Sequence, residues 1–148
     1  MSILPSILHE PIEALCEQGD KLFEQGNYGA ALQKYQEAET LLPSDRERWE
    51  ATTWVMAALG DARFFLGDIE GAAEAFATAQ RCPNGLGNAF IHLRLGQCEL
   101  ELMRPERALE QLAEAYRQGG IEIFEDEEDK YLDFLKTRVD LPEFSGQA

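Results

Sequence analysis

The spacing of small and aromatic residues between positions 60 and 83 constrains the fold of this chain more than any other feature. These residues recur at helical spacing: Gly60, Gly67, Ala72, Phe76, Ala79 and Pro83. Small residues at Gly60 and Ala72 allow two antiparallel helices to approach closely, and Phe76 fills the space that remains between them. Gly67 can adopt the left-handed conformation that ends a first helix, and Pro83 cannot extend a second. The pattern therefore predicts a tightly packed helical hairpin.

The same pattern occurs twice more in the chain. The upstream copy consists of Gly19, Gly26, Ala31, Tyr35, Ala38 and Pro43. The downstream copy consists of Gly96, Ala108, Leu112 and Ala115, with Met103 in place of the turn glycine and Gly120 in place of the proline. Three copies in register resemble the tetratricopeptide repeat (TPR) over roughly residues 11–120. The copies are 41 and 36 residues apart, against about 34 in the family, so we expect about two extra turns in a helix starting near Ser44.

The resemblance implies an all-α fold, a right-handed superhelix of three helix-turn-helix hairpins with a C-terminal capping helix. We expect an apolar N-terminal arm over residues 1–10, repeats over about 11–43, 45–83 and 86–120, a capping helix over 121–140 and a flexible tail over 141–148. The expected helices span about residues 11–25, 28–42, 45–66, 69–81, 87–102 and 104–118. Pro11 suits the first turn of the first helix. Capping is favoured for the C-terminal helix because the last repeat would otherwise expose its apolar face.

Composition limits the possible partners and the cellular compartment. The 148 residues suit one domain, and 28 acidic against 13 basic residues give a net charge of −15. Such a charge repels nucleic acid and anionic membranes, and it favours a basic partner or an uncharged one. Cys16, Cys82 and Cys98 form no Cys-x-x-Cys pair, which indicates reduced thiols in a cytoplasmic protein. The N-terminus lacks the basic flank of a signal peptide or anchor.

No motif in the sequence predicts catalysis, a cofactor or a metal site. The acidic run at 125–129 lacks the alternating ligands and internal glycine of an EF-hand loop. His92 stands at a position where the repeat has a large core residue, so a packed histidine is expected. There is no phosphate-binding glycine loop or nucleophile motif. We therefore expect no enzyme activity, although an enzyme remains the alternative from another class.

A groove lined by the first helix of each repeat is where TPR proteins bind their partners, and the register places eight candidate residues there: Asp20, Phe23, Trp54, Asp61, Phe64, Phe90, Arg94 and Gln97. Trp54, Phe64 and Phe90 are expected to form an apolar floor, with Asp20 and Asp61 selecting a basic residue. An alternative is that the groove receives the chain's own N-terminal arm or C-terminal helix.

Some TPR co-chaperones bind the terminal carboxylates of heat-shock proteins through groove lysines, arginines and asparagines. Only Arg94 fits that pattern here, because the other clamp positions hold Cys16, Asp20, Ala58 and Phe90. Carboxylate capture is therefore rejected.

The function expected from the sequence is non-catalytic: a protein-interaction module that binds a basic or apolar segment of one dedicated partner. Two more specific alternatives stay open. Three repeats in a small acidic chain resemble the architecture of secretion chaperones that hold apolar translocator segments. The C-terminal stretch 121–138 resembles that of small TPR proteins near bacterial toxin genes, which suggests an immunity or antitoxin protein. The sequence leaves the oligomeric state open.

Overall fold

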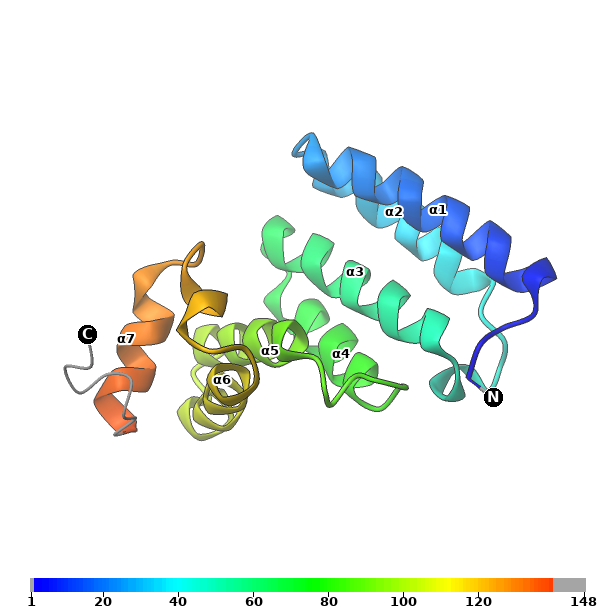
Figure 1. Cartoon of the computed structure of the whole chain (residues 1–148). Coiled ribbons are helices and arrows are strands. Elements are labelled where there is room, and N and C mark those ends of the chain that lie inside the picture. Colours follow the sequence, from blue (N-terminus) through cyan, green and yellow to red (C-terminus); the bar gives the residue numbers. More distant parts are fainter. Residues whose placement is uncertain (1, 140–148) are drawn as a thin grey trace. The chain divides into compact units, whose positions relative to one another are not determined.

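The computed structural model describes residues 2–139, and the expected tail at 141–148 lies outside them. The described residues form α1 (Ser6–Glu24), α2 (Tyr28–Thr40), the 3-10 helix η1 (Arg46–Arg48), α3 (Glu50–Leu66), α4 (Ile69–Gln80), α5 (Ala89–Glu101), α6 (Pro105–Gly119), the 3-10 helix η2 (Ile121–Phe124) and α7 (Asp129–Arg138) (Figure 1). The chain divides into two compact units, residues 1–86 and 87–148, where its length had predicted one.

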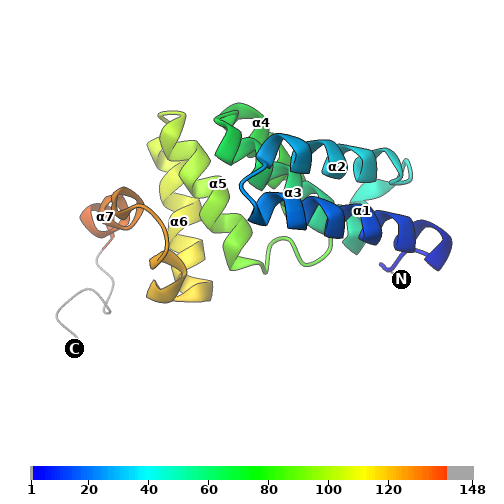
Figure 2. The ribbon, with the colours of Figure 1, turned by 90° about the horizontal axis from the view of Figure 1, so that it is seen from above.

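The first unit contains two helical hairpins, α1/α2 and α3/α4, whose paired helices run side by side (Figure 2). Each hairpin is tight because a glycine faces an aromatic ring. A Cβ atom at Gly19 would lie 2.5 Å from the ring of Tyr35, and one at Gly60 would lie 2.7 Å from the ring of Phe76. Both rings are buried. The predicted roles of these glycines in close helix packing are confirmed.

The second unit contains the hairpin α5/α6, followed by η2 and α7. Here Gly96 faces Leu112, and a Cβ atom at Gly96 would lie 2.7 Å from the leucine side chain. Helix α7 lies beside α6 (Figure 1) and closes an apolar cluster, which we call the C-terminal core: Leu93, Leu112, Ala115, Tyr116, Phe124, Tyr131 and Leu135. The C-terminal helix therefore covers the apolar face of the third hairpin, as expected of a cap.

The turns inside the three hairpins share one backbone geometry. Gly26 and Gly67 have φ of 81° and 89°, and Met103 has φ of 63° at the equivalent place in α5/α6. In each turn the next N–H donates to the carbonyl five residues back, at 2.9 Å in all three cases, as in a Schellman motif. Met103 thus adopts the conformation that the missing glycine would have provided, and its side chain is 84 % exposed.

Helix α1 begins at Ser6, five residues before the predicted start. Pro5, with φ −58° and ψ 151°, ends the extended N-terminal segment, and Pro11 lies inside the helix and not in its first turn. Of the expected apolar arm, Leu4 is buried, whereas Ile3 and Ile7 are exposed. The early start is favoured because Leu4 anchors the chain in the core just before the helix.

The predicted long helix over 45–66 is wrong at its start, because the extra residues form η1 and α3 begins at Glu50. Trp49 is extended, with φ −112° and ψ 136°, which separates the two helices. The Asp45 carboxylate accepts a hydrogen bond from Trp49 Nε1 at 3.0 Å instead of capping a helix. The N–H of Glu50 donates to the carbonyl of Ser2 at 2.8 Å, so the N-terminal segment caps α3.

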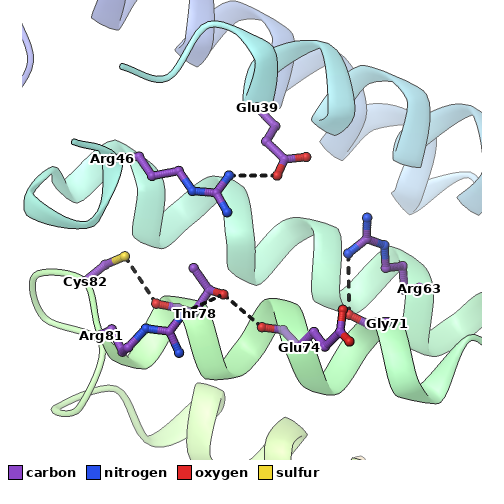
Figure 3. Close-up of polar contacts among 8 residues, drawn as sticks. All are labelled: Glu39, Arg46, Arg63, Gly71, Glu74, Thr78, Arg81 and Cys82. Carbon is purple, nitrogen blue, oxygen red and sulfur yellow. Dashed lines mark hydrogen bonds and ion pairs between the residues drawn. The ribbon is translucent and has the colours of Figure 1, made fainter. Parts of the chain in front are cut away.

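Polar contacts tie these segments of the first unit together (Figure 3). Arg46 of η1 pairs with Glu39 of α2 at 2.9 Å, and Arg63 of α3 donates to the Gly71 carbonyl of α4 at 3.4 Å. The buried Cys82 thiol donates to the Thr78 carbonyl at 3.2 Å, and burial raises its pKa. All three cysteines of the chain are free thiols.

Candidate functional site

A pocket of about 220 Å³ opens between α1, α2 and α3 of the first unit. We call it the acidic pocket, and its lining residues are Asp20, Phe23, Glu24, Tyr35, Ala58 and Asp61. Asp20, Phe23 and Asp61 were predicted as partner-binding residues, so the structure brings three of the eight candidates together. Helical spacing explains this grouping on α1, because residues three and four apart share a helix face.

The electrostatic environment of the acidic pocket is negative. The Tyr35 hydroxyl donates to Asp20 Oδ1 at 2.6 Å, and its pKa is raised by burial, by this hydrogen bond and by the charges of Asp20 and Asp61. Burial, together with Asp20 and Glu13, raises the pKa of the neighbouring Cys16 thiol to about 12. Cys16 is therefore a protonated, unreactive thiol at neutral pH. The pocket offers carboxylates to a cationic group and offers no reactive nucleophile.

Four aromatic rings form a contiguous cluster beside the acidic pocket, at the end of α1 and α3. We call them the aromatic surface: Phe23, Tyr28, Phe64 and Phe65. Phe65 stacks on Tyr28 with ring centroids 5.2 Å apart, and it meets Phe23 and Phe64 edge-on at 5.5 Å. Its side chain is 44 % exposed, and the adjacent Leu66 is 48 % exposed. Phe23 belongs to both the pocket and the surface.

Trp54 lies apart from the other candidates of the first unit. It is ten residues before Phe64 on α3, which places it about 15 Å away along the helix. Its indole meets the His9 ring of α1 edge-on, with centroids 5.2 Å apart, and it remains half-exposed. Of the apolar floor predicted from Trp54, Phe64 and Phe90, the first two therefore lie at separate places along α3, and Phe90 belongs to the second unit.

The α5 candidates are engaged by the chain's own C-terminal segment. The Arg94 guanidinium donates to Glu127 Oε1 at 2.6 Å and to Gln97 Oε1 at 2.8 Å. Gln97 Nε2 donates to the same Glu127 oxygen at 2.8 Å. Arg94 also lies over the ring of Phe90, 4.7 Å from its centroid. Arg94 is 7 % exposed and Gln97 is fully buried, so in this structure both make contacts inside the second unit, and their role in partner binding stays a prediction.

Glu127 is the functional group that sequence reasoning missed. The acidic run around it has no ligand-binding pattern, and nothing in the sequence links position 127 to Arg94. Its carboxylate takes the place that a partner's carboxylate would need in order to reach Arg94. On α5, Arg94 and Gln97 are thus engaged by the segment that precedes α7.

Several other expectations concern the rest of the described chain. The histidine at position 92 is buried and its Nδ1 lies 2.7 Å from Gln111 Oε1, which confirms the packed-core prediction. Residues 2–139 contain no grouping of three or more His, Cys, Asp or Glu side chains that could hold a metal ion. Within the same range, no helix is long and apolar enough to cross a bilayer.

Comparison with solved structures identifies the fold. No family model and no curated protein sequence matches the chain. The first TPR of Spaghetti (RPAP3), bound to the HSP90 peptide SRMEEVD, superposes with a TM-score of 0.66 and 18 % identity, covering 86 % of this chain and 90 % of that chain. The chain has a TPR fold. The Yersinia enterocolitica type III secretion chaperone SycD, in complex with a peptide of the translocator YopD, also shares this TPR fold, with a TM-score of 0.68, 16 % identity and coverage of 86 % and 92 %.

In a TPR fold, all eight candidate residues lie on equivalent helices. Helices α1, α3 and α5 are the first helices of the three TPR hairpins, and they carry all eight predicted positions. The acidic pocket lies between the first two of them. The equivalent face of α5 in the second unit contributes Leu93 to the C-terminal core and is covered by Glu127 and the segment around it.

Proposed function

We propose that this TPR protein is a non-catalytic interaction module that binds a basic or apolar segment of a dedicated protein partner. The observation that carries the proposal is the acidic pocket, with carboxylates from Asp20, Glu24 and Asp61, directly beside the aromatic surface. Both structurally similar proteins are complexes with peptides of other proteins, which supports a peptide as the ligand. The three free thiols fit a cytoplasmic location.

The charge of the pocket indicates that this chain binds a different kind of peptide from the one bound by RPAP3. The peptide bound by RPAP3 has the sequence SRMEEVD and is acidic. The acidic pocket would repel such a ligand, and Arg94 is already held by Glu127. A partner segment with positive charge is complementary to the pocket and to the net charge of −15.

A chaperone for an apolar translocator segment is a second candidate function. It is favoured by one specific observation: SycD, which shares the fold, is a secretion chaperone in complex with a translocator peptide. The aromatic surface supplies the apolar contact area that such a role needs.

Affinity capture from the native host followed by mass spectrometry tests the proposal, with Asp20→Asn/Asp61→Asn as the pocket variant. The matched control is Glu17→Gln/Glu110→Gln, which removes two charges from exposed positions outside the pocket. The wild type and the control should retain the same stoichiometric partner, and the pocket variant should lose it. Equal retention by all three proteins would place binding elsewhere and refute the proposed site.

A further inference from the structure

We infer that the partner segment presents an arginine directly beside a large apolar residue, with the arginine in the acidic pocket and the apolar side chain on the aromatic surface. This inference rests on the proposed function and specifies its ligand. The occupant is a segment of another protein.

The aromatic surface is an unusual feature for a solvent-facing helix end. Single exposed apolar side chains are common on proteins, but here Phe65 contacts the three other rings of the aromatic surface. Tyr28 and Phe65 are nearly parallel, with an interplanar angle of 20°, and Phe65 and Leu66 are both about half exposed. Contiguous exposed apolar patches with a polar rim mark interaction sites.

The size of the acidic pocket favours one side chain as its occupant. Its volume of about 220 Å³ is below the roughly 300–1,000 Å³ of small-molecule sites. The lining contains three carboxylates and no basic residue. Arg63, which is close in sequence to Asp61, is directed to the Gly71 carbonyl of α4. Charge complementarity therefore selects a cation.

The wall of the pocket favours arginine over lysine. Phe23 lines the pocket together with carboxylates from α1 and α3. A guanidinium group is planar, so it can stack on an aromatic ring while its fork of N–H groups donates to carboxylates. A lysine ammonium has no flat face and is more strongly hydrated.

Phe23 also explains why the two ligand residues are adjacent. It lines the pocket and contacts two members of the aromatic surface, with centroid distances of 4.9 Å to Tyr28 and 5.5 Å to Phe65. The pocket and the surface thus share one wall. Consecutive residues of a peptide have Cα atoms 3.8 Å apart, so neighbouring side chains can reach both sides of that ring.

The test uses the full ¹⁵N-labelled chain and acetylated, amidated octapeptides in which Gly and Ser flank a central pair. The pairs are Arg-Leu and Leu-Arg, with Lys-Leu, Gln-Leu and Arg-Ser as matched controls. At least one Arg–Leu order should shift the amide signals of the pocket and of the aromatic surface together. Gln-Leu and Arg-Ser should each bind at least about tenfold more weakly, which corresponds to about 1.4 kcal/mol, and Lys-Leu should lie between.

Variants of the protein assign each half of the ligand to its site. Asp61→Asn should weaken Arg-Leu binding while leaving Gln-Leu unchanged. Phe65→Ala should weaken Arg-Leu binding while leaving Arg-Ser unchanged. The amide spectrum of each free variant shows whether it is folded, and the conservative change at Asp61 keeps the pocket testable if Phe65→Ala unfolds.

Four results of the peptide titrations would overturn the inference: no shift with either Arg–Leu order, equal binding of Gln-Leu, equal binding of Arg-Ser, or shifts confined to the second unit. Concentration-dependent shifts at the aromatic surface without peptide would also overturn it, because a second copy would then cover the surface. These failures leave the proposed function standing if the pocket variant still loses the captured partner. If the peptide titrations fail and the Asp20→Asn/Asp61→Asn variant also retains the captured partner, both proposals are refuted.

Discussion

Replacing Gly60 with alanine tests the packing on which the repeat assignment depends. The new Cβ would lie 2.7–2.8 Å from three ring carbons of Phe76, which is fully buried. Contact between carbon atoms is optimal at about 3.5–4.0 Å, so the ring and the two helices must move apart by nearly 1 Å. Overpacking of this kind costs about 1–3 kcal/mol, and the better helix propensity of alanine offsets about 1 kcal/mol of it. We expect a net destabilisation of about 0–2 kcal/mol, where the same helix propensity alone would give a net stabilisation.

Urea unfolding followed by tryptophan fluorescence measures the change in the free energy of unfolding of the first unit. The chain has two tryptophans, and both Trp49 and Trp54 belong to the same unit as Gly60. Phe76→Leu removes the ring that the new methyl group would meet, so Gly60→Ala should cost much less in that background. The coupling free energy of the double-mutant cycle should be about 2 kcal/mol.

The control substitution is Gly29→Ala on α2, where a Cβ would meet nothing within 4 Å. This change should stabilise the first unit slightly, because alanine is the better helix former. The reasoning is refuted if Gly60→Ala and Gly29→Ala shift the urea midpoint alike, or if the cycle with Phe76→Leu shows no coupling.

Three further predictions follow from single contacts. Met103→Gly should stabilise the chain by about 0.5–1 kcal/mol in thermal unfolding, because glycine adopts positive φ without strain, and Met103→Ala should show no such gain. Glu127→Gln should cost about 3 kcal/mol in urea unfolding followed by circular dichroism, because it removes the negative charge that pairs with the buried Arg94; a loss below 1 kcal/mol would contradict the burial argument. Hydrogen bonds from Lys130 and from the Tyr131 hydroxyl lower the pKa of Glu101. The ionised Glu101 therefore stabilises the docking of α7 above the ordinary carboxyl pKa, and this stabilisation is lost as the pH falls. Amide protection of α7 should decrease on acidification in the wild type and not in Glu101→Gln.

The sequence predicted the hairpins well because their determinants are local and steric. A glycine opposite a ring leaves little freedom in how two helices can pack, and the turn glycines define where each first helix ends. The register even located the left-handed turn at Met103, where glycine is absent.

The helix starts were less predictable because they depend on contacts distant in sequence. The early start of α1 follows burial of Leu4, and the late start of α3 follows a hydrogen bond from Glu50 to Ser2. Neither contact has a periodic signal in the sequence.

For the candidate site, the sequence predicted which positions of one helix lie together, but not which distant segment contacts them. The α1 and α3 positions Asp20, Phe23 and Asp61 share a pocket because helical periodicity groups residues on one face. The contacts of the α5 positions Arg94 and Gln97 could not be predicted in this way, because their neighbour Glu127 lies 33 residues beyond Arg94. Sequence periodicity shows which face a residue occupies, but it does not show what covers that face.

The hydrogen bonds between Ser2 and Glu50 have a consequence for how the chain folds during synthesis. Each hairpin pairs helices that are adjacent in sequence, so it closes a short loop and can form soon after it leaves the ribosome. The contact from Ser2 to Glu50 closes a loop across 48 positions, and it has to wait until α3 has emerged. The first hairpin should therefore form before the N-terminal segment docks, and this segment should reach its final position after the two helices that follow it in the sequence.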